Sequence, residues 1–479
     1  MGARTGDLSR RAAALLFPAG RTRSAGAAPE EPAKLVVEGG RSLSGTVSPS
    51  GSKNATLPLL AASLLTREEV VLRGAPELRD VDVMSAVLRA VGCRVERRSD
   101  GSLAAQTVDE GPQTAPYDLV RQMRGSFCVL GPLLARRRVA RVSLPGGCVI
   151  GDRPVDIHLK GLCALGAEVA VEHGDVVARA PHGLRGGEIY LGSAYGSTVL
   201  GTCNILMAAC LARGRTVIEC AACEPEVESL AGLLARMGAR IRGAGTHRIE
   251  IEGVDDLGGA AVTVPPDRIE AATFLLAGFL TGGDVRVERF PTRYLAALLD
   301  RIEQAGGEFE RAPDSCRTRS AGRLRATDVT TLPFPGFPTD LQAQWIALMS
   351  VADGVGVITE RVFPDRYMHI SELNRLGARI RREGPYAIIQ GVSALSGAPV
   401  MASDLRASAA LVMAGLVATG RTEVRGLHHL DRGYERFDEK LRSLGARIER
   451  VPEDALVPRP PARKRPRTVR RGRPVAART

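Results

Sequence analysis

The chain has 479 residues, 44% of them hydrophobic and 25% charged, a composition that excludes a disordered or fibrous protein and predicts two or three domains. Its formal net charge is +12, but residues 1–33 carry +2 and residues 452–479 carry +7, so residues 34–451 carry only +3. A nearly neutral body with 4% aromatic residues argues against a nucleic-acid partner bound by base stacking.

The two ends of the chain differ in composition from the body. The apolar run that follows Arg10 and Arg11 stops at Pro18, which is too early for a secretory signal, and residues 452–479 are rich in Pro and Arg. We therefore predict a disordered leader at 1–33, a disordered basic tail at 452–479 and a cytoplasmic protein. No apolar run reaches the roughly 18 residues of a membrane helix, so we expect no membrane contact.

A scarce lysine marks the first candidate site along the chain. Only five residues are lysines, and one of them, Lys53, stands in the phrase Gly-Ser-Lys-Asn just before the helical run Leu57–Leu65. Backbone N–H groups at a helix N-terminus, the positive end of the helix dipole and an ammonium group all suit an anion. The sequence thus predicts an anion site at Lys53.

One phrase recurs six times: a helical run, a glycine, and then an alternating strand. Glycine suits the left-handed position that ends a helix, so each phrase predicts a helix-to-strand corner. The spacing is 74, 72, 68, 71 and 68 residues between Gly92, Gly166, Gly238, Gly306, Gly377 and Gly445. A period near 70 leaves room for a β-α-β-α-β-β module, so we predict an α/β protein with three modules in each of two domains. Ligands favour a cleft between such halves.

Cysteine use indicates reduced thiols, because nine is an odd number and no secretory signal is present. Cys148 differs from the other eight, since it lies between glycines in a loop that Arg153 follows, where a thiol would be accessible with a lowered pKa. The other eight stand in apolar sequence contexts, and the pair Cys220 and Cys223 is interpreted as small buried hydrophobic residues. No cysteine or histidine spacing fits a metal site, so no metal is expected.

Two aspartates each stand just before a long helical pattern. The plain interpretation of Asp340 and Asp404 is an N-cap in both cases, and a role beyond capping requires arginines to face them. Arg366 and Arg432 are candidates for that role. Neither a phosphate-binding GxxxxGK[ST] nor a complete GxGxxG follows a strand, so no nucleotide cofactor is expected.

Several phrases together resemble the enolpyruvyl transferase family in family order over about 34–451, among them GSKNATLPLLAASLL, SLPGGCVIGDRPVDIH, FPTDLQAQ and MASDLRASAALVMAG. The Gly-Gly-Cys loop resembles the branch that acts on UDP-N-acetylglucosamine rather than the shikimate-pathway branch. The resemblance implies an inside-out α/β barrel with six β-α-β-α-β-β repeats, three per domain. One domain is expected at 55–266, and a discontinuous one at 34–54 plus 267–451.

The implied reaction transfers the enolpyruvyl group of phosphoenolpyruvate to the 3′-hydroxyl of UDP-N-acetylglucosamine with release of phosphate, the first committed step of peptidoglycan synthesis. The chemistry needs an acid/base pair and much positive charge. By motif position, Cys148 matches a mobile thiol described as a proton donor, and Asp340 matches the base near the sugar hydroxyl. Lys53 completes the implied catalytic set, and Asp267 matches a residue at the interdomain hinge.

The resemblance also implies a substrate-binding set. Its cations, which hold phosphoenolpyruvate and the nucleotide diphosphate, are Lys53, Arg124, Arg153, Arg366, Arg406 and Arg432. The remaining members are expected at or beside the uridine, the diphosphate and the amino sugar. They are Asn54, Pro154, Val155, Asp156, Ile157, Thr198, Val199, Val362 and Asp404. The expected partners are therefore small-molecule substrates.

The loop expected to contact the diphosphate departs from the family pattern Lys-x-Ser-Val-Gly-Ala-Thr. Gly196 stands at the lysine position and Leu200 at the glycine position. Outside this loop, Pro364 stands where the family usually has an acidic residue after Val-Phe. Two alternatives therefore stay open. One is a divergent relative that transfers enolpyruvyl to another uridine nucleotide, such as uridine monophosphate, in a nucleoside-antibiotic pathway. The other is a non-catalytic relative that binds partners through its basic tails.

Overall fold

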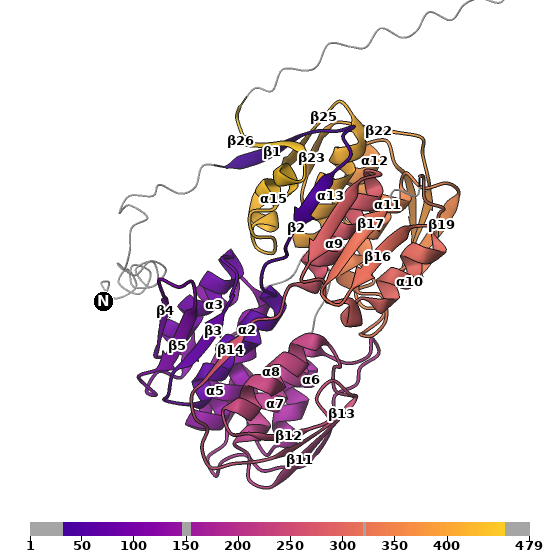
Figure 1. Cartoon of the computed structure of the whole chain (residues 1–479). Coiled ribbons are helices and arrows are strands. Elements are labelled where there is room, and N and C mark those ends of the chain that lie inside the picture. The colour runs from indigo at the N-terminus through magenta and orange to yellow at the C-terminus, as the bar shows by residue number, and fades with distance from the viewer. Residues whose placement is uncertain (1–31, 146–154, 320–321, 456–479) are drawn as a thin grey trace, which may run out of the picture.

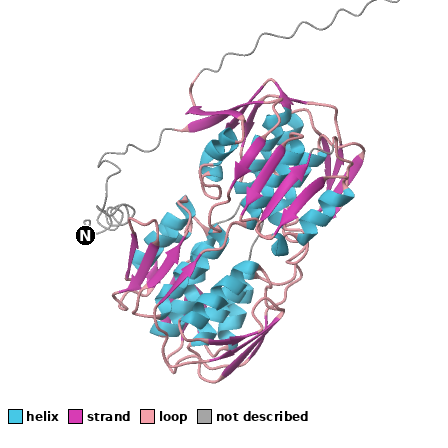
Figure 2. Cartoon of the chain, in the orientation of Figure 1, coloured by secondary structure: helices cyan, strands magenta, loops and turns pink. Residues whose placement is uncertain are grey.

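The computed structural model describes residues 32–145, 155–319 and 322–455. Cys148, Arg153 and Pro154 lie outside the described residues, as does most of the predicted leader and tail. The described chain forms two halves, one above the other in Figure 1, with helices packed inside and strands on the outside (Figure 2).

Six four-stranded sheets share one topology: a parallel pair of strands is extended by two antiparallel neighbours. In the lower half of Figure 1 the sheets are β14 (Ala260–Thr263), β3 (Val70–Arg73), β5 (Leu103–Thr107) and β4 (Cys93–Arg97); β6 (Thr114–Ala115), β7 (Val139–Ser143), β9 (Asp175–Arg179) and β8 (Glu168–Glu172); and β10 (Glu188–Tyr190), β11 (Arg215–Glu219), β13 (Arg248–Glu252) and β12 (Arg240–Arg242).

The upper half repeats this topology. Its sheets are β2 (Ser44–Val47), β15 (Asp284–Glu288), β17 (Ser315–Arg319) and β16 (Glu308–Ala312); β18 (Val329–Thr330), β19 (Val355–Thr359), β21 (Tyr386–Gln390) and β20 (Arg379–Glu383); and β23 (Pro399–Met401), β25 (Arg421–Arg425), β1 (Ala33–Glu38) and β26 (Arg447–Pro452), with a small extra pair of β22 (Leu395–Ser396) and β24 (Ala418–Thr419). Six copies of one sheet confirm the predicted six-module α/β fold.

Each predicted helix-to-strand corner is present. The corner helices are α3 (Arg79–Ala90), α6 (Asp156–Ala164), α8 (Pro225–Arg236), α10 (Ala296–Gln304), α12 (His369–Arg375) and α15 (Phe437–Ser443). The six glycines that follow them have φ between 84° and 108°, the left-handed region that residues with a Cβ rarely adopt. The glycine period therefore records a backbone requirement.

The second helix of each module lies inside. These helices are α2 (Lys53–Ala61), α5 (Leu130–Arg137), α7 (Val199–Cys210), α9 (Arg268–Leu280), α11 (Gln342–Met349) and α13 (Leu405–Val417), with short turns α4 (Tyr117–Val120), α14 (Leu427–Leu430), η1 (Ala62–Leu65), η2 (Arg124–Val129), η3 (Thr292–Tyr294) and η4 (Thr339–Leu341). Every residue of α11 is buried, and its two polar members, Gln342 and Gln344, donate hydrogen bonds inside the protein. Among the described residues no helix is long and apolar enough to cross a membrane, and the cytoplasmic location stays a prediction.

The buried apolar residues form two clusters. One draws on residues between Ala55 and Val264, and the other on residues between Leu35 and Val47 and between Ile269 and Ile448. We therefore propose that the chain divides as the sequence predicts, into 55–266 and 34–54 plus 267–451.

The folded body extends beyond both of its predicted ends, 34 and 451. Ala33 and Pro452, assigned to the leader and the tail, pair with each other across β1 and β26. Beyond the strand, Lys34 Nζ donates to the carbonyl of Ala455 at 2.7 Å. Neighbouring residues do not show where these two strands begin and end, because the pairing partner of each lies more than 400 residues away.

Two segments run side by side between the halves. Gly51 and Pro266 form an antiparallel bridge, and the Asp267 N–H donates to the Ser50 carbonyl at 2.8 Å. A Cβ on Gly51 would stand 2.0 Å from the Gly74 carbonyl oxygen, so only glycine fits at this crossing. Asp267, the residue expected at the interdomain hinge, is the N-cap of α9 and is 4% exposed. Its side chain therefore has a structural role at the start of that helix.

Candidate active site

Asp340 is held by two arginines from different elements. Its Oδ1 accepts from Arg366 Nη1 at 2.8 Å, and its Oδ2 accepts from Arg406 Nη2 at 2.9 Å and Nε at 3.2 Å. Both arginines are buried, while the Asp340 side chain is 26% exposed. Burial alone would raise the pKa of Asp340, but the two guanidinium groups outweigh it and hold that pKa well below its usual range. Asp340 is therefore an ionised carboxylate.

The N-cap interpretation is right for Asp404 and wrong for Asp340. Asp404 Oδ1 accepts from the N–H groups of Arg406 at 2.8 Å and Ala407 at 3.0 Å, which begins α13. Asp340 lies inside η4 and caps no helix with its side chain. The cap at Asp404 instead fixes the first turn of α13, from which Arg406 reaches Asp340.

A buried glutamate that sequence reasoning missed organises the same region. Glu360 is 0% exposed, and its Oε1 accepts from Thr331 Oγ1 at 2.6 Å and from the Val362 N–H at 2.8 Å. Its Oε2 accepts from Thr339 Oγ1 at 2.9 Å, next to Asp340. Glu360 thereby connects the segment of Val362, a predicted contact, to the segment of Asp340. Its position directly after strand β19, which alternates buried and more exposed residues, is the signal that could have found it.

A second cluster joins the two halves through Asp80. This carboxylate is 2% exposed on α3, accepts from Lys53 Nζ at 3.0 Å and accepts from Arg432 Nε at 2.8 Å. Burial would raise the pKa of Asp80, but Lys53 and Arg432 together lower it below its ordinary value. Sequence reasoning named both cations and missed Asp80, which looks like any acidic residue in the first turn of a helix.

Arg432 does not lie where the sequence predicts it, beside Asp340 or Asp404. Arg432 does not contact Asp340 or Asp404 but pairs with Asp80, and its place beside Asp340 is taken by Arg406. Arg432 follows the short turn α14 in the chain, whereas Arg406 lies in the first turn of α13.

Lys53 occupies the predicted helix start. It is the first residue of α2, with Ser52 as the N-cap, and its side chain is 11% exposed. Asn54 follows it and is partly exposed, and Arg124 begins η2 with a partly exposed side chain.

The predicted uridine segment is described only in part. Val155, Asp156 and Ile157 form the start of α6, with Asp156 exposed and its two neighbours partly exposed. The first two residues of that segment fall outside the described residues, so its geometry stays a prediction.

The divergent loop begins a helix. Thr198 is the N-cap of α7, and its Oγ1 accepts from the Gly201 N–H at 3.3 Å, with Val199 as the first helical residue. Gly196 has φ +93°, and a Cβ there would stand 2.9 Å from Pro333 Cγ of the upper half. A lysine at position 196 would therefore need Pro333 to shift and would adopt a backbone conformation that residues with a Cβ rarely take.

The prediction that Cys220 and Cys223 are buried was wrong, and Cys163 is exposed although its sequence neighbours are apolar. Cys220 and Cys223 are partly exposed. Cys220 has φ +56° and, like Cys223, lies in the turn that links β11 to α8, whereas Cys163 lies in α6. Apolar sequence neighbours do not predict burial at a turn.

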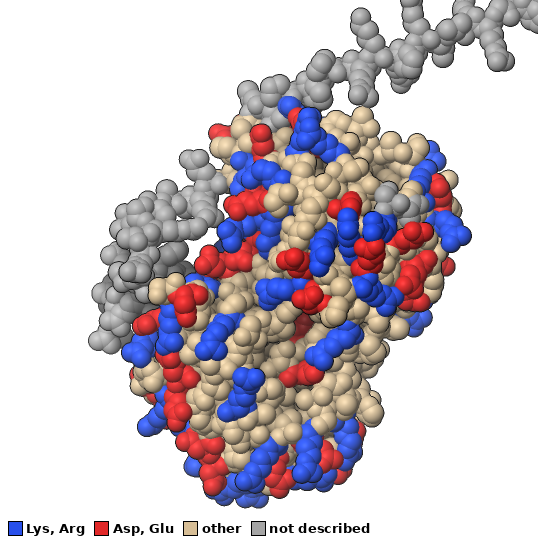
Figure 3. Space-filling model, in the orientation of Figure 1, with Lys and Arg blue, Asp and Glu red and all other residues tan. Residues whose placement is uncertain are grey.

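The visible face carries both signs of charge intermixed and is hollowed between the two halves (Figure 3). Residues 37–441 match the family described as EPSP synthase (3-phosphoshikimate 1-carboxyvinyltransferase). The chain is 52% identical over 421 residues to UDP-N-acetylglucosamine 1-carboxyvinyltransferase of Methylacidiphilum infernorum, covering 87% of this chain and 99% of the relative. The chain belongs to the EPSP synthase family.

Further relatives support the same membership. UDP-N-acetylglucosamine 1-carboxyvinyltransferase 2 of Carboxydothermus hydrogenoformans is 53% identical over 420 residues, covering 87% of this chain and 99% of the relative. The crystal structure of the enolpyruvyl transferase NikO from Streptomyces tendae matches with a TM-score of 0.79 and 26% identity, covering 88% of this chain and 99% of NikO. EPSP synthase from Acinetobacter baumannii, at 19% identity, covers 88% of this chain and all of that one with a TM-score of 0.68, and shares the fold. The enolpyruvyl transferase fold is thus confirmed.

Proposed function

We propose that the protein transfers the enolpyruvyl group of phosphoenolpyruvate to the 3′-hydroxyl of UDP-N-acetylglucosamine and releases phosphate, the first committed step of peptidoglycan synthesis. The observation that carries the proposal is the 52% identity to a UDP-N-acetylglucosamine 1-carboxyvinyltransferase over 99% of that relative. Because the relatives are named as transferases over nearly their full length, the non-catalytic alternative is set aside.

Two clusters of cations support the proposal, since both substrates are anions. Arg366 and Arg406 present planar guanidinium groups, which bind a carboxylate or phosphate through two oxygens at once. Lys53 and Arg432, gathered by Asp80, offer a second cationic position. Phosphoenolpyruvate carries one carboxylate and one phosphate, which matches the number of clusters.

Substrate binding changes the basicity of Asp340 in this scheme. The anion competes with Asp340 for Arg366 and Arg406, which hold that carboxylate in the free protein. As a guanidinium group moves to the substrate, the pKa of Asp340 rises toward its ordinary range. Asp340 then accepts the proton of the sugar hydroxyl more readily, at the moment when both substrates are present.

The proton steps follow from the reaction. Addition of the sugar 3′-oxygen to C2 of phosphoenolpyruvate requires a proton at C3, for which Cys148 is the donor by resemblance, while Asp340 takes the hydroxyl proton. The acid/base pair then takes a proton from C3, the double bond re-forms, and the C2–oxygen bond breaks with its electron pair staying on the phosphate oxygen. Lys53 and the arginines stabilise the charge that phosphate gains as it leaves.

A uridine monophosphate-like acceptor is the second candidate. The observation in its favour is the loop at Gly196, where the expected lysine is absent and Pro333 fills the space that a side chain would need. An acceptor with one phosphate fewer would need one cation fewer. The high identity to UDP-N-acetylglucosamine 1-carboxyvinyltransferases favours the first candidate.

One assay separates the candidates. Phosphate release from phosphoenolpyruvate is measured with UDP-N-acetylglucosamine, uridine monophosphate or shikimate 3-phosphate as the acceptor, each alone and then in competition. We expect turnover with UDP-N-acetylglucosamine and little with the other two. Turnover with uridine monophosphate alone would replace the first candidate by the second, and release with none of the three would contradict both.

A further inference from the structure

The first turn of α8 reaches across the boundary between the halves. Three glutamates at this end of the helix, Glu224, Glu226 and Glu228, form an acidic seam. Glu224 Oε1 accepts the Phe334 N–H at 3.3 Å, Glu226 Oε1 accepts from Arg268 Nε at 3.3 Å, and Glu228 Oε2 accepts from the Tyr294 hydroxyl at 2.8 Å. Every one of these partners belongs to the upper half. The seam is therefore an interdomain contact built from a single helical turn.

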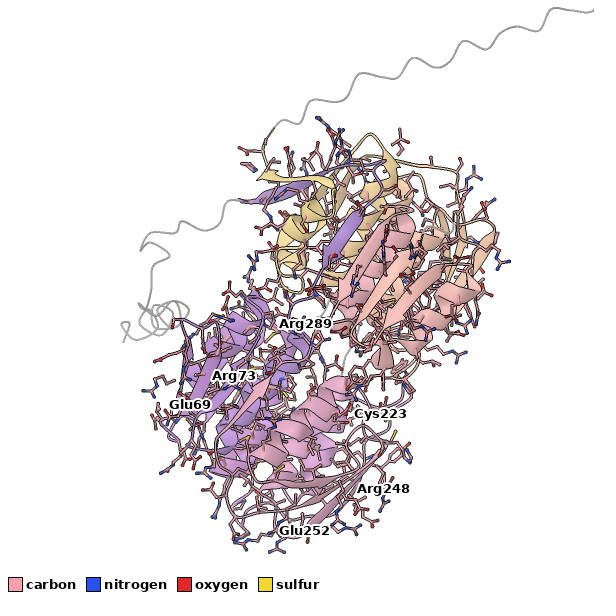
Figure 4. The ribbon with its side chains drawn as sticks, in the orientation of Figure 1. Glu69, Arg73, Cys223, Arg248, Glu252 and Arg289 are labelled. Carbon is pink, nitrogen blue, oxygen red and sulfur yellow. The ribbon has the colours of Figure 1, made fainter. Side chains whose placement is uncertain are left out.

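The side chain of Glu224 contacts the opposite half and does not cap its own helix. It stands at the N-cap of α8, where a side-chain oxygen ordinarily accepts from its own helix, yet it makes no cap hydrogen bond. Pro225 at the first helical position has no N–H to satisfy, which reduces the need for a cap. The Glu224 side chain is consequently directed to Phe334. Cys223, the residue before it, lies at the rim of the lower half in Figure 4.

Charge and burial make the seam a costly arrangement. Glu226 is 5% exposed, Arg268 has an 11% exposed side chain, and Glu224 Oε2, Glu226 Oε2 and Arg268 Nη1 are buried with no hydrogen-bond partner in the described structure. Burial and the charge of Glu226 raise the pKa of Glu224, while Arg268 lowers it. An arrangement with such a cost needs a compensating role.

The partner of Glu224 is the tip of the loop that leads to Asp340. The base of the loop is closed by the Leu332 N–H, which donates to the Phe337 carbonyl at 3.1 Å. At the tip, the Phe334 ring lies over the Arg268 guanidinium at 5.7 Å and meets the Tyr294 ring edge-on at 6.1 Å. The loop then enters η4, where Asp340 lies six residues after Phe334.

From this geometry we infer that Glu224 is a positioning residue: from the opposite half it fixes the 332–337 loop and thereby the place of Asp340, so that the base is set only when the halves are together. The inference rests on the proposed function for the role of Asp340. It adds a residue of the lower half to a site whose base and two guanidinium groups all belong to the upper half.

The test compares variants of Glu224 in the full-length chain. Glu224→Ala removes the acceptor, whereas Glu224→Gln keeps an oxygen for the Phe334 N–H and adds an amide that can donate to Glu226. Glu224→Leu keeps side-chain bulk without an acceptor and serves if the alanine variant fails to fold. Glu252→Gln is the matched control, because Glu252 is exposed at the end of strand β13 of the same half (Figure 4).

Hydrogen exchange of the peptide spanning 332–340 is the direct readout. In Glu224→Ala we expect about tenfold faster exchange at Phe334 and about a tenfold lower kcat, with KM for phosphoenolpyruvate changed less than about twofold, as the loss of one hydrogen bond implies. The emission of Trp345, the single tryptophan, provides a spectroscopic check, because its ring lies edge-on to Phe337 at 5.6 Å. Glu224→Gln and Glu252→Gln should match the wild type in all three measurements.

Two results would overturn the inference: wild-type exchange and kcat in Glu224→Ala and Glu224→Leu, or a Glu224→Gln variant that behaves like Glu224→Ala. Failure of the proposed function gives a different result. In that case the wild type releases no phosphate with UDP-N-acetylglucosamine, while the exchange at Phe334 still reports whether Glu224 holds the loop.

Discussion

Asp80 and Asp340 do the same physical work in two places. Each is a carboxylate that collects two cations from separate elements and keeps them from repelling each other while no substrate is bound. A set of unpaired buried cations would be costly, because each would lack a counter-charge in a region of low dielectric. The cationic character of the site therefore depends on two anions.

Removal of the Asp80 charge tests this account. Asp80→Asn leaves Lys53 and Arg432 without a counter-ion, so we expect unfolding free energy to fall by an amount on the order of 3 kcal/mol and turnover to fall with it. Chemical denaturation followed by circular dichroism measures the change. Asp314→Asn, at an exposed position, is the control and should be neutral.

The pH dependence of the same variant has a defined sign. The pKa of Asp80 is lowered in the folded state, so its stabilisation is present above the unfolded value of 3.8 and is lost as the pH falls through the lower folded value. The difference between wild type and Asp80→Asn should thus persist at pH 5 to 8 and shrink below about pH 4. A difference that grows on acidification would contradict the pairing.

Glu270 predicts the opposite sign. It lies on α9 beside the crossing segments, accepts from the Ser50 N–H at 2.8 Å and Lys440 Nζ at 2.6 Å, and is 2% exposed. Burial raises the pKa of Glu270 from 4.5 to about 7. Because the folded state then holds a proton that the unfolded state has lost, Glu270 costs stability as pH rises from 4.5 through 7.

A glutamine at position 270 removes this titration. Relative to wild type, Glu270→Gln should gain stability as pH rises from 5 to 8, by at most about 3 kcal/mol. Denaturation midpoints of both proteins at several pH values measure the gain. A constant difference across this range would mean that Glu270 stays ionised throughout.

At the scale of elements, the helix-to-strand corner is the recurring unit of this fold. Its glycine serves the same backbone need six times, but the surroundings differ. A Cβ at Gly166 would meet nothing within 4 Å, whereas one at Gly92 would stand 2.0 Å from the Asp109 carbonyl oxygen. A side chain at Gly166 would therefore cost only the strain of the left-handed backbone, whereas one at Gly92 would also collide with the Asp109 carbonyl.

Alanine substitutions separate the two costs. Gly166→Ala should lower the unfolding free energy by about 1 kcal/mol, the cost of a left-handed residue with a Cβ. Gly92→Ala should cost clearly more, because the Asp109 backbone must also move. Thermal unfolding of the two variants makes the comparison, and equal shifts would show that the surroundings of Gly92 yield without cost.

At the scale of the whole molecule, charge is distributed unevenly between body and ends. The body is nearly neutral, and its visible face mixes both signs (Figure 3), whereas residues 452–479 carry +7. The folded body extends to Ala455, whose carbonyl accepts from Lys34, so this basic segment overlaps the last strand.

Truncation should respect that boundary. A chain ending at Ala455 should keep wild-type kcat and KM in the phosphate-release assay, since β26 and its contacts remain. A chain ending at Val451 loses Pro452 from the strand and the Lys34 contact, and should unfold at a lower temperature. Loss of activity on removal of 456–479 would instead give that segment a role in turnover.

Local sequence was sufficient wherever one segment specifies its own structure. The six corners, the start of α2 at Lys53 and the cap at Asp404 depend on neighbours within a few residues, and all were predicted. The resemblance was likewise sufficient for the fold and the family. Arg366 was among the arginines expected to face Asp340, but the choice of Arg406 rather than Arg432 as the second one was not predictable, because Arg406 lies 66 residues away.

Tertiary structure alone decided how the modules are completed and which anions hold the cations together. Strand β14 pairs with β3, whose residues lie 190 positions earlier, and β1 and β2 each complete one sheet of the upper half. Short strands carry little register information of their own, since their hydrogen bonds are satisfied by partners distant in sequence. For the same reason Asp80 and Glu360 were invisible as site residues: a counter-ion is defined by what lies beside it in space.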